Sequence, residues 1–287
     1  MSGPFARPWT RRLRYGWIIE AALGAVVYFL YDDLRERVAG SAHVALLNAR
    51  DLIHVEKFIG LYQELWLQRA FIDAGWFISF WNIYYGTVHF VMPVVALVLL
   101  WRRAPERYIV WRNTLLVMLA IGLVFFWAYP LMPPRLMPQR GFVDTAAEFF
   151  NFGPQQRVVL VHGVPNAAAK AAFGNLFAAM PSFHGGWSMW STLAMLPVLR
   201  SRWTKLVVLL DPLLTLFAIV VTANHWILDA VGGWIVLGVS WLLIAAYEKR
   251  RHPDDWARSG WRAVAASVRR DRTAATTPAD AAAPAQA

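Results

Sequence analysis

Residues 226–247 read WILDAVGGWIVLGVSWLLIAAY, a run of 22 residues in which Asp229 is the one charged side chain. A helix needs about 20 mostly apolar residues to cross the hydrocarbon core of a bilayer. Five more runs along the chain have a similar character. The six candidate spans are Gly16–Tyr31, Trp76–Leu100, Asn113–Met132, His184–Leu199, Leu206–Thr222 and Trp226–Tyr247. The sequence therefore predicts an all-α integral membrane protein with a bundle of six transmembrane helices.

The composition of the whole chain agrees with this fold class. Of the 287 residues, 58% are hydrophobic and 16% are charged, against about 45–50% and about 25% in soluble domains. This excess of apolar residues excludes a disordered chain and argues against a soluble enzyme. The chain has no cysteine, which excludes disulfides, thiolate chemistry and zinc–sulfur sites.

The basic residues predict an orientation in the membrane. Segments 1–15, 101–112, 200–205 and 248–287 would share one side and hold 19 of the 28 Lys and Arg residues, whereas segments 32–75 and 133–183 hold nine. Because cytoplasmic loops carry the excess of Lys and Arg, both termini are expected in the cytoplasm, with the protein in the cell membrane. The same clustering beside apolar runs explains the net charge of +10 without a nucleic-acid partner.

Three parts follow from this topology. Residues 1–15 form a basic cytoplasmic tail, residues 16–247 form the six-helix membrane catalytic domain, and residues 248–287 form a second basic tail that is disordered at its end. Apolar residues at helical spacing over 41–71 predict an amphipathic helix on the outer surface, with Glu56 and Glu64 as solvated charges. The proline-rich segment 133–183 is expected to form a long, irregular outer loop.

The strongest candidate for chemistry is a histidine followed four residues later by an aspartate. On a helix, His225 and Asp229 would share a face, about 6 Å apart along the axis. The carboxylate can then accept a hydrogen bond from one imidazole nitrogen and leave the other nitrogen as a nucleophile or a base.

Two further residues fall on the same predicted side of the membrane. His184 opens the fourth span, and Arg135 lies at the outer end of the third. Two histidines, a carboxylate and an arginine suit phosphoryl transfer, which needs a nucleophile, a proton donor and positive charge over the phosphate oxygens. The competing class is a non-catalytic membrane binder or transporter in which the histidines only connect helices. A transporter should have paired charges near the bilayer midplane, whereas these residues gather at one interface.

The spacing of these motifs resembles that of a known family. Pro181–Ser182–Phe183–His184 and His225–Trp226–Ile227–Leu228–Asp229 resemble the second and third signature motifs of the type-2 phosphatidic acid phosphatase superfamily. The sequence segments that flank these motifs resemble the branch of inositolphosphorylceramide synthases and their bacterial relatives. These segments are PPRL at 133–136, GFVDT at 141–145, AAMPS at 178–182 and the pair Asn224–His225. The resemblance covers roughly residues 40–245.

The resemblance implies a phosphohistidine enzyme that acts on a membrane lipid phosphate at the extracytoplasmic face, without a metal or another cofactor. His225 would be the nucleophile, Asp229 its orienting partner and His184 the acid, while Arg135 and Ser182 would hold phosphate oxygens. Water or an alcohol acceptor such as inositol would then attack the intermediate. The alternative within the superfamily is a phosphatase for phosphatidic acid or an isoprenyl pyrophosphate.

The chain also departs from the pattern of the phosphatase members. Ala218 and Ile219 stand where those members have Ser-Arg, and Ala128 stands where they have a lysine. Two cationic phosphate contacts are therefore missing, which favours the synthase-like branch. Replacement charge is expected from the outer loop, and the three candidates are Arg140, Arg157 and Lys170. His89, in the second span, is interpreted first as a buried hydrogen-bonding residue and second as a substrate-binding residue.

Overall fold

The computed structural model describes residues 16–145, 160–161, 164–165 and 175–251. The described helices are α1 (Gly16–Arg37), α2 (Ala42–Phe58), α3 (Glu64–Phe71), α4 (Gly75–Arg103), α5 (Pro105–Ala128), α8 (Phe183–Met195), α9 (Arg202–Val221) and α10 (Ile227–Arg251). Two short 3₁₀ turns, η2 (Pro134–Leu136) and η3 (Pro138–Arg140), follow α5, and β1 (Leu160–Val161) pairs antiparallel with β2 (Val164–Pro165). The predicted helical architecture is confirmed for this part of the chain.

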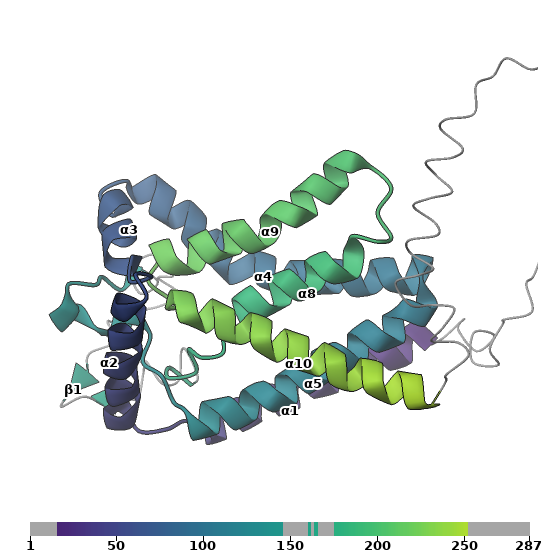
Figure 1. Cartoon of the computed structure of the whole chain (residues 1–287), viewed down its shortest axis with the longest axis horizontal. Coiled ribbons are helices and arrows are strands. Elements are labelled where there is room, and N and C mark those ends of the chain that lie inside the picture. The colour runs from purple at the N-terminus through teal and green to yellow at the C-terminus, as the bar shows by residue number, and fades with distance from the viewer. Residues whose placement is uncertain (1–15, 146–159, 162–163, 166–174, 252–287) are drawn as a thin grey trace, which may run out of the picture.

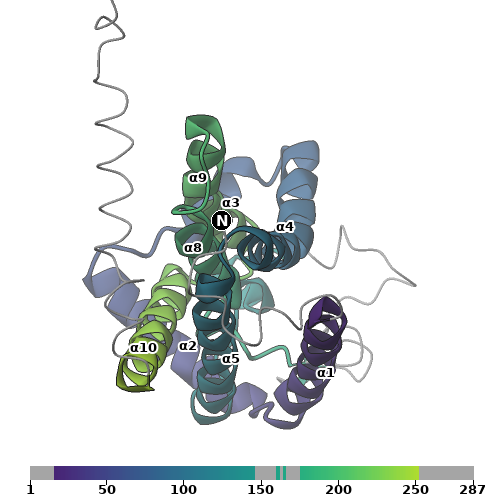
Figure 2. The ribbon, with the colours of Figure 1, turned by 90° about the vertical axis from the view of Figure 1, so that its right-hand side faces the viewer.

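The long helices form a bundle around the short helix α8 (Figures 1 and 2). Helix α8 packs against α4, α9 and α10, and α10 also packs along α5. Helix α1 lies at the periphery of this bundle beside α5. None of its side chains is fully buried.

Four helices are long and apolar enough to cross a membrane, namely 75–103, 107–128, 202–221 and 227–251. The predicted count of six spans is not confirmed, because α1 and α8 do not meet the same criterion. Helix α1 carries Glu20, Asp32 and Asp33. Helix α8 has only 13 residues and measures about 20 Å, less than the thickness of a hydrocarbon core.

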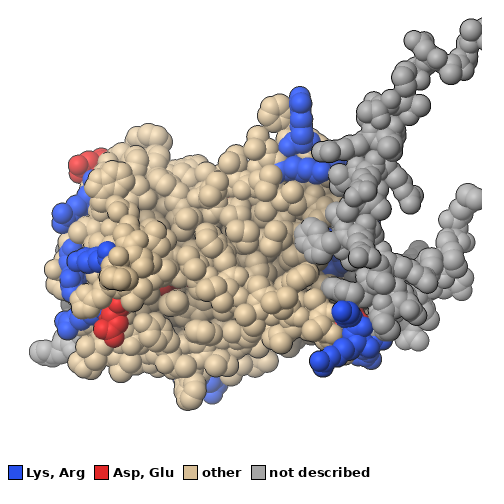
Figure 3. Space-filling model, in the orientation of Figure 1, with Lys and Arg blue, Asp and Glu red and all other residues tan. Residues whose placement is uncertain are grey.

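The surface supports a membrane environment. Large apolar side chains of α4, α9 and α10 are exposed, among them Phe80, Leu213 and Leu242. Figure 3 shows that charged side chains gather towards the two ends of the visible face and leave a broad uncharged band between them. A soluble protein rarely exposes apolar patches of this extent.

The predicted third span, Asn113–Met132, differs from α5 at both ends, and prolines account for both differences. Helix α5 begins at Pro105, where proline suits the first turn of a helix, and not at Asn113. It ends at Ala128 and not at Met132, because Pro130 lacks the N–H that a continued helix would need.

Segment 41–71, which the sequence predicts to be one amphipathic surface helix, is two helices. The chain turns between α2 and α3 at Gly60, which has φ +76°, a conformation that glycine adopts at little cost. Helix α2 crosses one end of the bundle (Figure 1). There its buried face, including Ala45, Ala49 and Ile53, joins a core cluster with Trp226.

Helices α8 and α10 approach each other closely because glycines line their contact. A Cβ atom on Gly233 would lie 2.2 Å from the carbonyl oxygen of Ser182, and one on Gly186 would lie 3.2 Å from the carbonyl oxygen of Gly233. The backbone N–H of Ser182 also donates to the carbonyl oxygen of Asp229 at 2.8 Å. The first turns of the two helices are therefore held in direct backbone contact.

Candidate active site

The candidate site lies where α8 and α10 begin. His225 belongs to the tight turn between α9 and α10, in which Ala223 adopts φ +55°. The backbone N–H groups of Asn224 and His225 both donate to the carbonyl oxygen of Ile219, at 2.9 and 3.1 Å. The Asn224 bond and the bond from the N–H of Ala223 to the carbonyl oxygen of Val220 at 2.9 Å form a Schellman turn at the end of α9. The additional bond from His225 fixes the backbone that carries the histidine.

The imidazole of His225 is oriented by two acceptors on the same ring nitrogen. Nδ1 lies 3.0 Å from the carbonyl oxygen of Ala179 and 3.2 Å from Oδ2 of Asp229. A carbonyl and a carboxylate can only accept, so the proton of the neutral ring belongs on Nδ1. Nε2 is then left with a free lone pair, which is the state that a nucleophile or a base requires.

The His225–Asp229 contact arises differently from the predicted shared helix face. Helix α10 begins at Ile227, so His225 precedes it and does not lie on its surface. Asp229 folds back over the first turn, where Oδ2 also accepts from the N–H of Trp226 at 3.0 Å. The same carboxylate thus caps the helix and orients the histidine.

His184 occupies the first turn of α8 and stands beside His225. The ring centroids of the two histidines are 5.3 Å apart. Tyr85 of α4 stacks on His184 with centroids 4.0 Å apart and an interplanar angle of 15°. Nε2 of His184 is buried and has no hydrogen-bond partner among the described residues, and the side chain also lines a cavity.

His89 has features of both interpretations drawn from the sequence. Its Nδ1 lies 2.6 Å from the carbonyl oxygen of Tyr85, one turn earlier in α4, as a structural histidine would place it. Its ring also lies beside that of His184, with centroids 3.9 Å apart, and it lines the same cavity.

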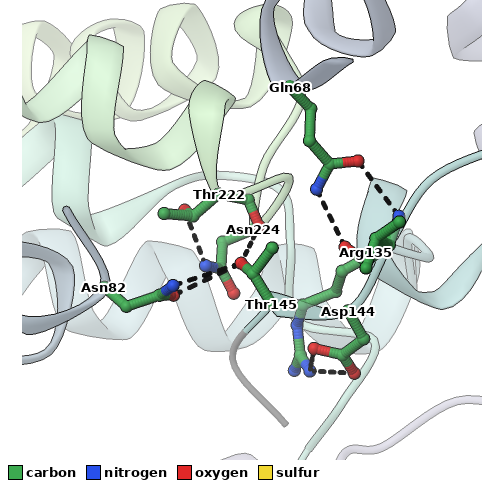
Figure 4. Close-up of polar contacts among 8 residues, drawn as sticks. Gln68, Asn82, Arg135, Asp144, Thr145, Thr222 and Asn224 are labelled. Carbon is green, nitrogen blue, oxygen red and sulfur yellow. Dashed lines mark hydrogen bonds and ion pairs between the residues drawn. The ribbon is translucent and has the colours of Figure 1, made fainter. Parts of the chain in front are cut away.

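Arg135 reaches the site from η2 and is held by its neighbours. Its Nη1 lies 3.0 and 3.3 Å from the two carboxylate oxygens of Asp144. Its backbone N–H donates to the carbonyl oxygen of Ala223 at 2.8 Å. Figure 4 shows the Arg135–Asp144 pair beside the turn that carries Asn224.

A network of amides and hydroxyls fastens the segment containing Asp144 to the helices around it (Figure 4). Gln68 of α3 bonds both backbone groups of Val143, at 2.8 and 3.0 Å. Thr145 donates to the carbonyl oxygen of Thr222 at 3.3 Å, and Asn82 of α4 donates to Thr145 at 3.2 Å. These bonds fix the position of the Arg135–Asp144 pair relative to the turn before α10.

The other predicted phosphate contacts are placed differently. Ser182 is fully buried, and its hydroxyl caps α8 by accepting from the N–H of Gly185 at 3.3 Å. It does not line the cavity, so a phosphate contact for this hydroxyl stays a prediction. Arg140 is exposed on η3 and does not line the cavity either. Arg157 and Lys170 lie outside the described residues.

A cavity of about 640 Å³ connects the site with the interior of the bundle. At one end it is lined by His184, His225 and Arg135. It continues between α1, α4 and α5, where its walls are mostly apolar. The apolar lining includes Leu23, Val27, Leu97, Leu115 and Leu119. At the far end, Glu20 of α1 pairs with Arg112 of α5.

Sequence reasoning missed a cation in this cavity. Arg35, in the last turn of α1, lines the cavity together with Arg135. Its Nε is buried and has no hydrogen-bond partner among the described residues, and one Nη lies 3.5 Å from Asp32. The cavity brings α1 together with η2, α8 and the turn before α10, which are distant from it in the sequence, and no local motif around Arg35 indicates this.

Glu56 and Glu64 are not the solvated charges that the sequence predicts. Both side chains are 0% exposed. Burial and the negative charge of Glu64 raise the pKa of Glu56 to about 9. Burial also raises the pKa of Glu64. Amphipathic spacing could not reveal this, because the groups that they bond lie more than 160 residues away in α10.

Comparison with known proteins bears on this site. The family model of the PAP2 superfamily, the type-2 phosphatidic acid phosphatases, matches residues 50–243, which is more than half of the chain. The match includes His184, Arg135, His225 and Asp229. The comparison with curated proteins gave no match, and neither did the comparison with solved structures.

Proposed function

This chain belongs to the PAP2 superfamily and is a lipid phosphatase or phosphotransferase, and on that premise we propose that it works through a phosphohistidine at His225. The observation that carries the proposal is the orientation of this ring. Nδ1 faces two acceptors, and the ring lines the cavity with His184 and Arg135. A nucleophilic nitrogen, a proton donor and a cation thus meet at one end of one cavity.

The proposed reaction has two steps. Nε2 of His225 attacks phosphorus, the bond from phosphorus to the leaving oxygen breaks, and protonated His184 gives that oxygen its proton. Water or an alcohol then attacks the phosphohistidine and releases the histidine, while neutral His184 takes the proton of the attacking hydroxyl. Asp229 stabilises the positive charge that develops on the ring of His225.

Arg135 and Arg35 are proposed to bind the phosphate oxygens. Both line the cavity near the histidines. Arg35 would supply positive charge in place of the cationic positions that are Ile219 and Ala128 here. Guanidinium groups suit this role because they stay charged and donate several hydrogen bonds to phosphate oxygens.

The cavity favours a substrate with a long apolar chain. Its volume falls within the 300–1,000 Å³ or so of small-molecule sites. From Phe126 to Arg112 its wall follows α5 over 14 residues, or about 21 Å. With the headgroup phosphate at the histidines, the chain of a lipid phosphate would lie between α1, α4 and α5. Inositol as acceptor rests on the resemblance to the synthase branch.

The first test uses purified protein in detergent with a panel of lipid phosphates, with and without inositol. Phosphate release and new lipid products are measured beside His225→Ala. A new inositol-dependent lipid that disappears in the variant identifies a phosphotransferase, and phosphate release that disappears identifies a phosphatase. Rapid quenching in alkali should trap a labelled phosphohistidine in the unchanged protein. Turnover by a folded His225→Ala variant would refute the mechanism.

Sidedness forms a separate part of the proposal. We propose the topology predicted from the sequence, with six spans, α2 and α3 on the outer surface and both termini in the cytoplasm; in this arrangement the site would lie at the extracytoplasmic face. The chain has no cysteine, so a single introduced cysteine is the only thiol in the protein that a reagent can label. A cysteine at the exposed Gln139 should react with an impermeant thiol reagent in intact cells, and one at the exposed Ser201 should not. The reverse pattern would place the site inside.

A further inference from the structure

Carboxylates cap the start of α10 in an unusual way. The first N–H groups of a helix have no partner within the helix and are commonly satisfied by one capping side chain. Here three successive N–H groups each donate to a different carboxylate. The bonds run from Trp226 to Asp229 Oδ2 at 3.0 Å, from Ile227 to Glu64 Oε1 at 2.9 Å and from Leu228 to Glu56 Oε1 at 2.9 Å.

Two of these carboxylates come from the outer helices. Glu56 lies in the last turn of α2, and Glu64 is the first residue of α3. Each reaches across the end of the bundle to the turn that directly follows His225. On the basis of the phosphohistidine mechanism proposed above, we propose that Glu56 and Glu64 are positioning residues that hold the first turn of α10, and with it His225 and Asp229, in the reactive arrangement.

The burial of these two acids supports a specific role. Both are 0% exposed, and a buried carboxylate destabilises a protein unless it is well satisfied. Each uses one oxygen, Oε1, to accept from α10. The other oxygen of each, Oε2, is buried and has no hydrogen-bond partner among the described residues. Burial and the negative charge of Glu64 raise the pKa of Glu56 to about 9, so at neutral pH Glu56 keeps its proton and the pair carries a single negative charge. That charge lies at the positive end of the α10 dipole, where an anion is stabilised.

The groups around the pair define when this proton is released. Burial and the charges of Glu64 and Asp229 favour the protonated form of Glu56, whereas the N–H of Leu228 favours the charged form. For Glu64, burial raises the pKa, and the N–H of Ile227 lowers it. Glu56 therefore keeps its proton at neutral pH and releases it in alkaline solution.

More distant charges face the pair from the outer side. The phenol of Tyr62, between α2 and α3, interacts with both acids, and burial together with Glu64 raises its pKa. Lys57 stands over the Tyr62 ring at 5.0 Å, and the positive charges of Arg69 and Arg140 act on the same phenol. When Glu56 releases its proton, the carboxylates of Glu56, Glu64 and Asp229 are all charged around one helix turn. Their repulsion should loosen that turn.

The test compares two substitutions at Glu56 in the full chain. Glutamine preserves an acceptor for Leu228 and is uncharged, as protonated Glu56 is, so Glu56→Gln should retain kcat within about threefold at neutral pH. The unchanged protein is expected to lose kcat as the pH rises through about 9, and Glu56→Gln should remove this loss. Glu56→Ala leaves the Leu228 N–H without a carboxylate and should lower kcat by about 10- to 100-fold, with KM changed less than about threefold, because a misplaced nucleophile slows the chemical step.

The controls separate this inference from the mechanism on which it rests. Asp51 is an exposed acid on α2, so Asp51→Asn should change neither kcat nor the pH profile. If His225→Ala keeps its activity, the proposed mechanism fails. If His225→Ala is inactive while Glu56→Ala keeps full kcat, only the positioning role is overturned. If Glu56→Ala does not fold, the Glu56→Gln variant decides. The positioning role is supported if kcat of this variant no longer declines at alkaline pH, and it is overturned if kcat declines as in the unchanged protein.

Discussion

The contact between α8 and α10 gives a prediction that one methyl group can test. Gly233→Ala would place a Cβ atom 2.2 Å from the carbonyl oxygen of Ser182 and 3.1 Å from the nitrogen of Gly186. Both are backbone atoms, so no side chain can rotate away to make room. Even a close carbon–oxygen contact measures about 3.3 Å. The two helices would have to separate by about 1 Å at this point.

The separation would act directly on the reactive groups. The backbone of Ser182 bonds to Asp229 at 2.8 Å and accepts from Gly186 at 3.0 Å, so a shift there moves the start of α8 and His184 relative to His225. A displacement of 1 Å in a catalytic arrangement can lower the rate by about 100-fold. Overpacking of a tight contact destabilises a protein by about 1–3 kcal/mol. We therefore expect Gly233→Ala to lose between one and two orders of magnitude in kcat.

The assay pairs phosphate release with thermal unfolding of the purified protein in detergent. Gly238→Ala is the matched control, because it lies one and a half turns further along α10 and its Cβ atom would meet nothing within 4 Å. This control should retain activity within about twofold and should not lose stability, since alanine favours a helix over glycine by up to about 1 kcal/mol. If Gly233→Ala matches Gly238→Ala in kcat and in unfolding temperature, the close helix contact does not position the site.

Three further predictions follow from the cavity, the ion pair and the buried acid. Gly24→Phe should fill the cavity between α1 and α5. It should raise KM for a long-chain lipid phosphate at least tenfold more than KM for a short, water-soluble phosphate ester. Equal effects on the two substrates would contradict a cavity that binds the lipid chain. Asp144→Asn removes the carboxylate that holds Arg135 and should lower kcat/KM for the same lipid by about 10-fold. An unchanged kcat/KM would show that Asp144 does not contribute to the site. Because native Glu56 keeps its proton to about pH 9 while the unfolded chain releases it near 4.5, stability should fall as the pH rises between these values, by at most ~1.4 kcal/mol per pH unit. Thermal unfolding from pH 5 to 9 checks this, and Glu56→Gln should flatten the dependence; an equally steep curve for the variant would assign the effect to another group.

Local patterns in the sequence predicted the helical class and four residues that lie close together in the structure, namely Arg135, His184, His225 and Asp229. Long apolar runs identified α4, α5, α9 and α10, because each run alone is long enough to cross a bilayer. The spacing of His225 and Asp229 predicted their contact, although the contact forms through a helix cap and not along a helix face.

The features that could not be predicted depend on contacts between distant segments. Glu56 and Glu64 have the spacing of an exposed helix face, and their burial follows only from the position of α10 across the end of the bundle. Arg35 likewise joins the cavity only because α1 folds back beside α5. Periodicity reports which residues share a face, and it does not report which distant element covers that face.

The peripheral position of α1 has a consequence for the cavity that it lines. One side of this helix lines the cavity, and none of its side chains is fully buried in the core. Glu20 accepts from Tyr108 and Arg112 of α5, and Asn175 donates to the carbonyl oxygen of Arg35, so α1 is attached to the bundle near both of its ends. The part of the helix between these attachments borders the cavity and sets its width. A substitution there would alter access to the site without changing any residue proposed to contact the phosphate.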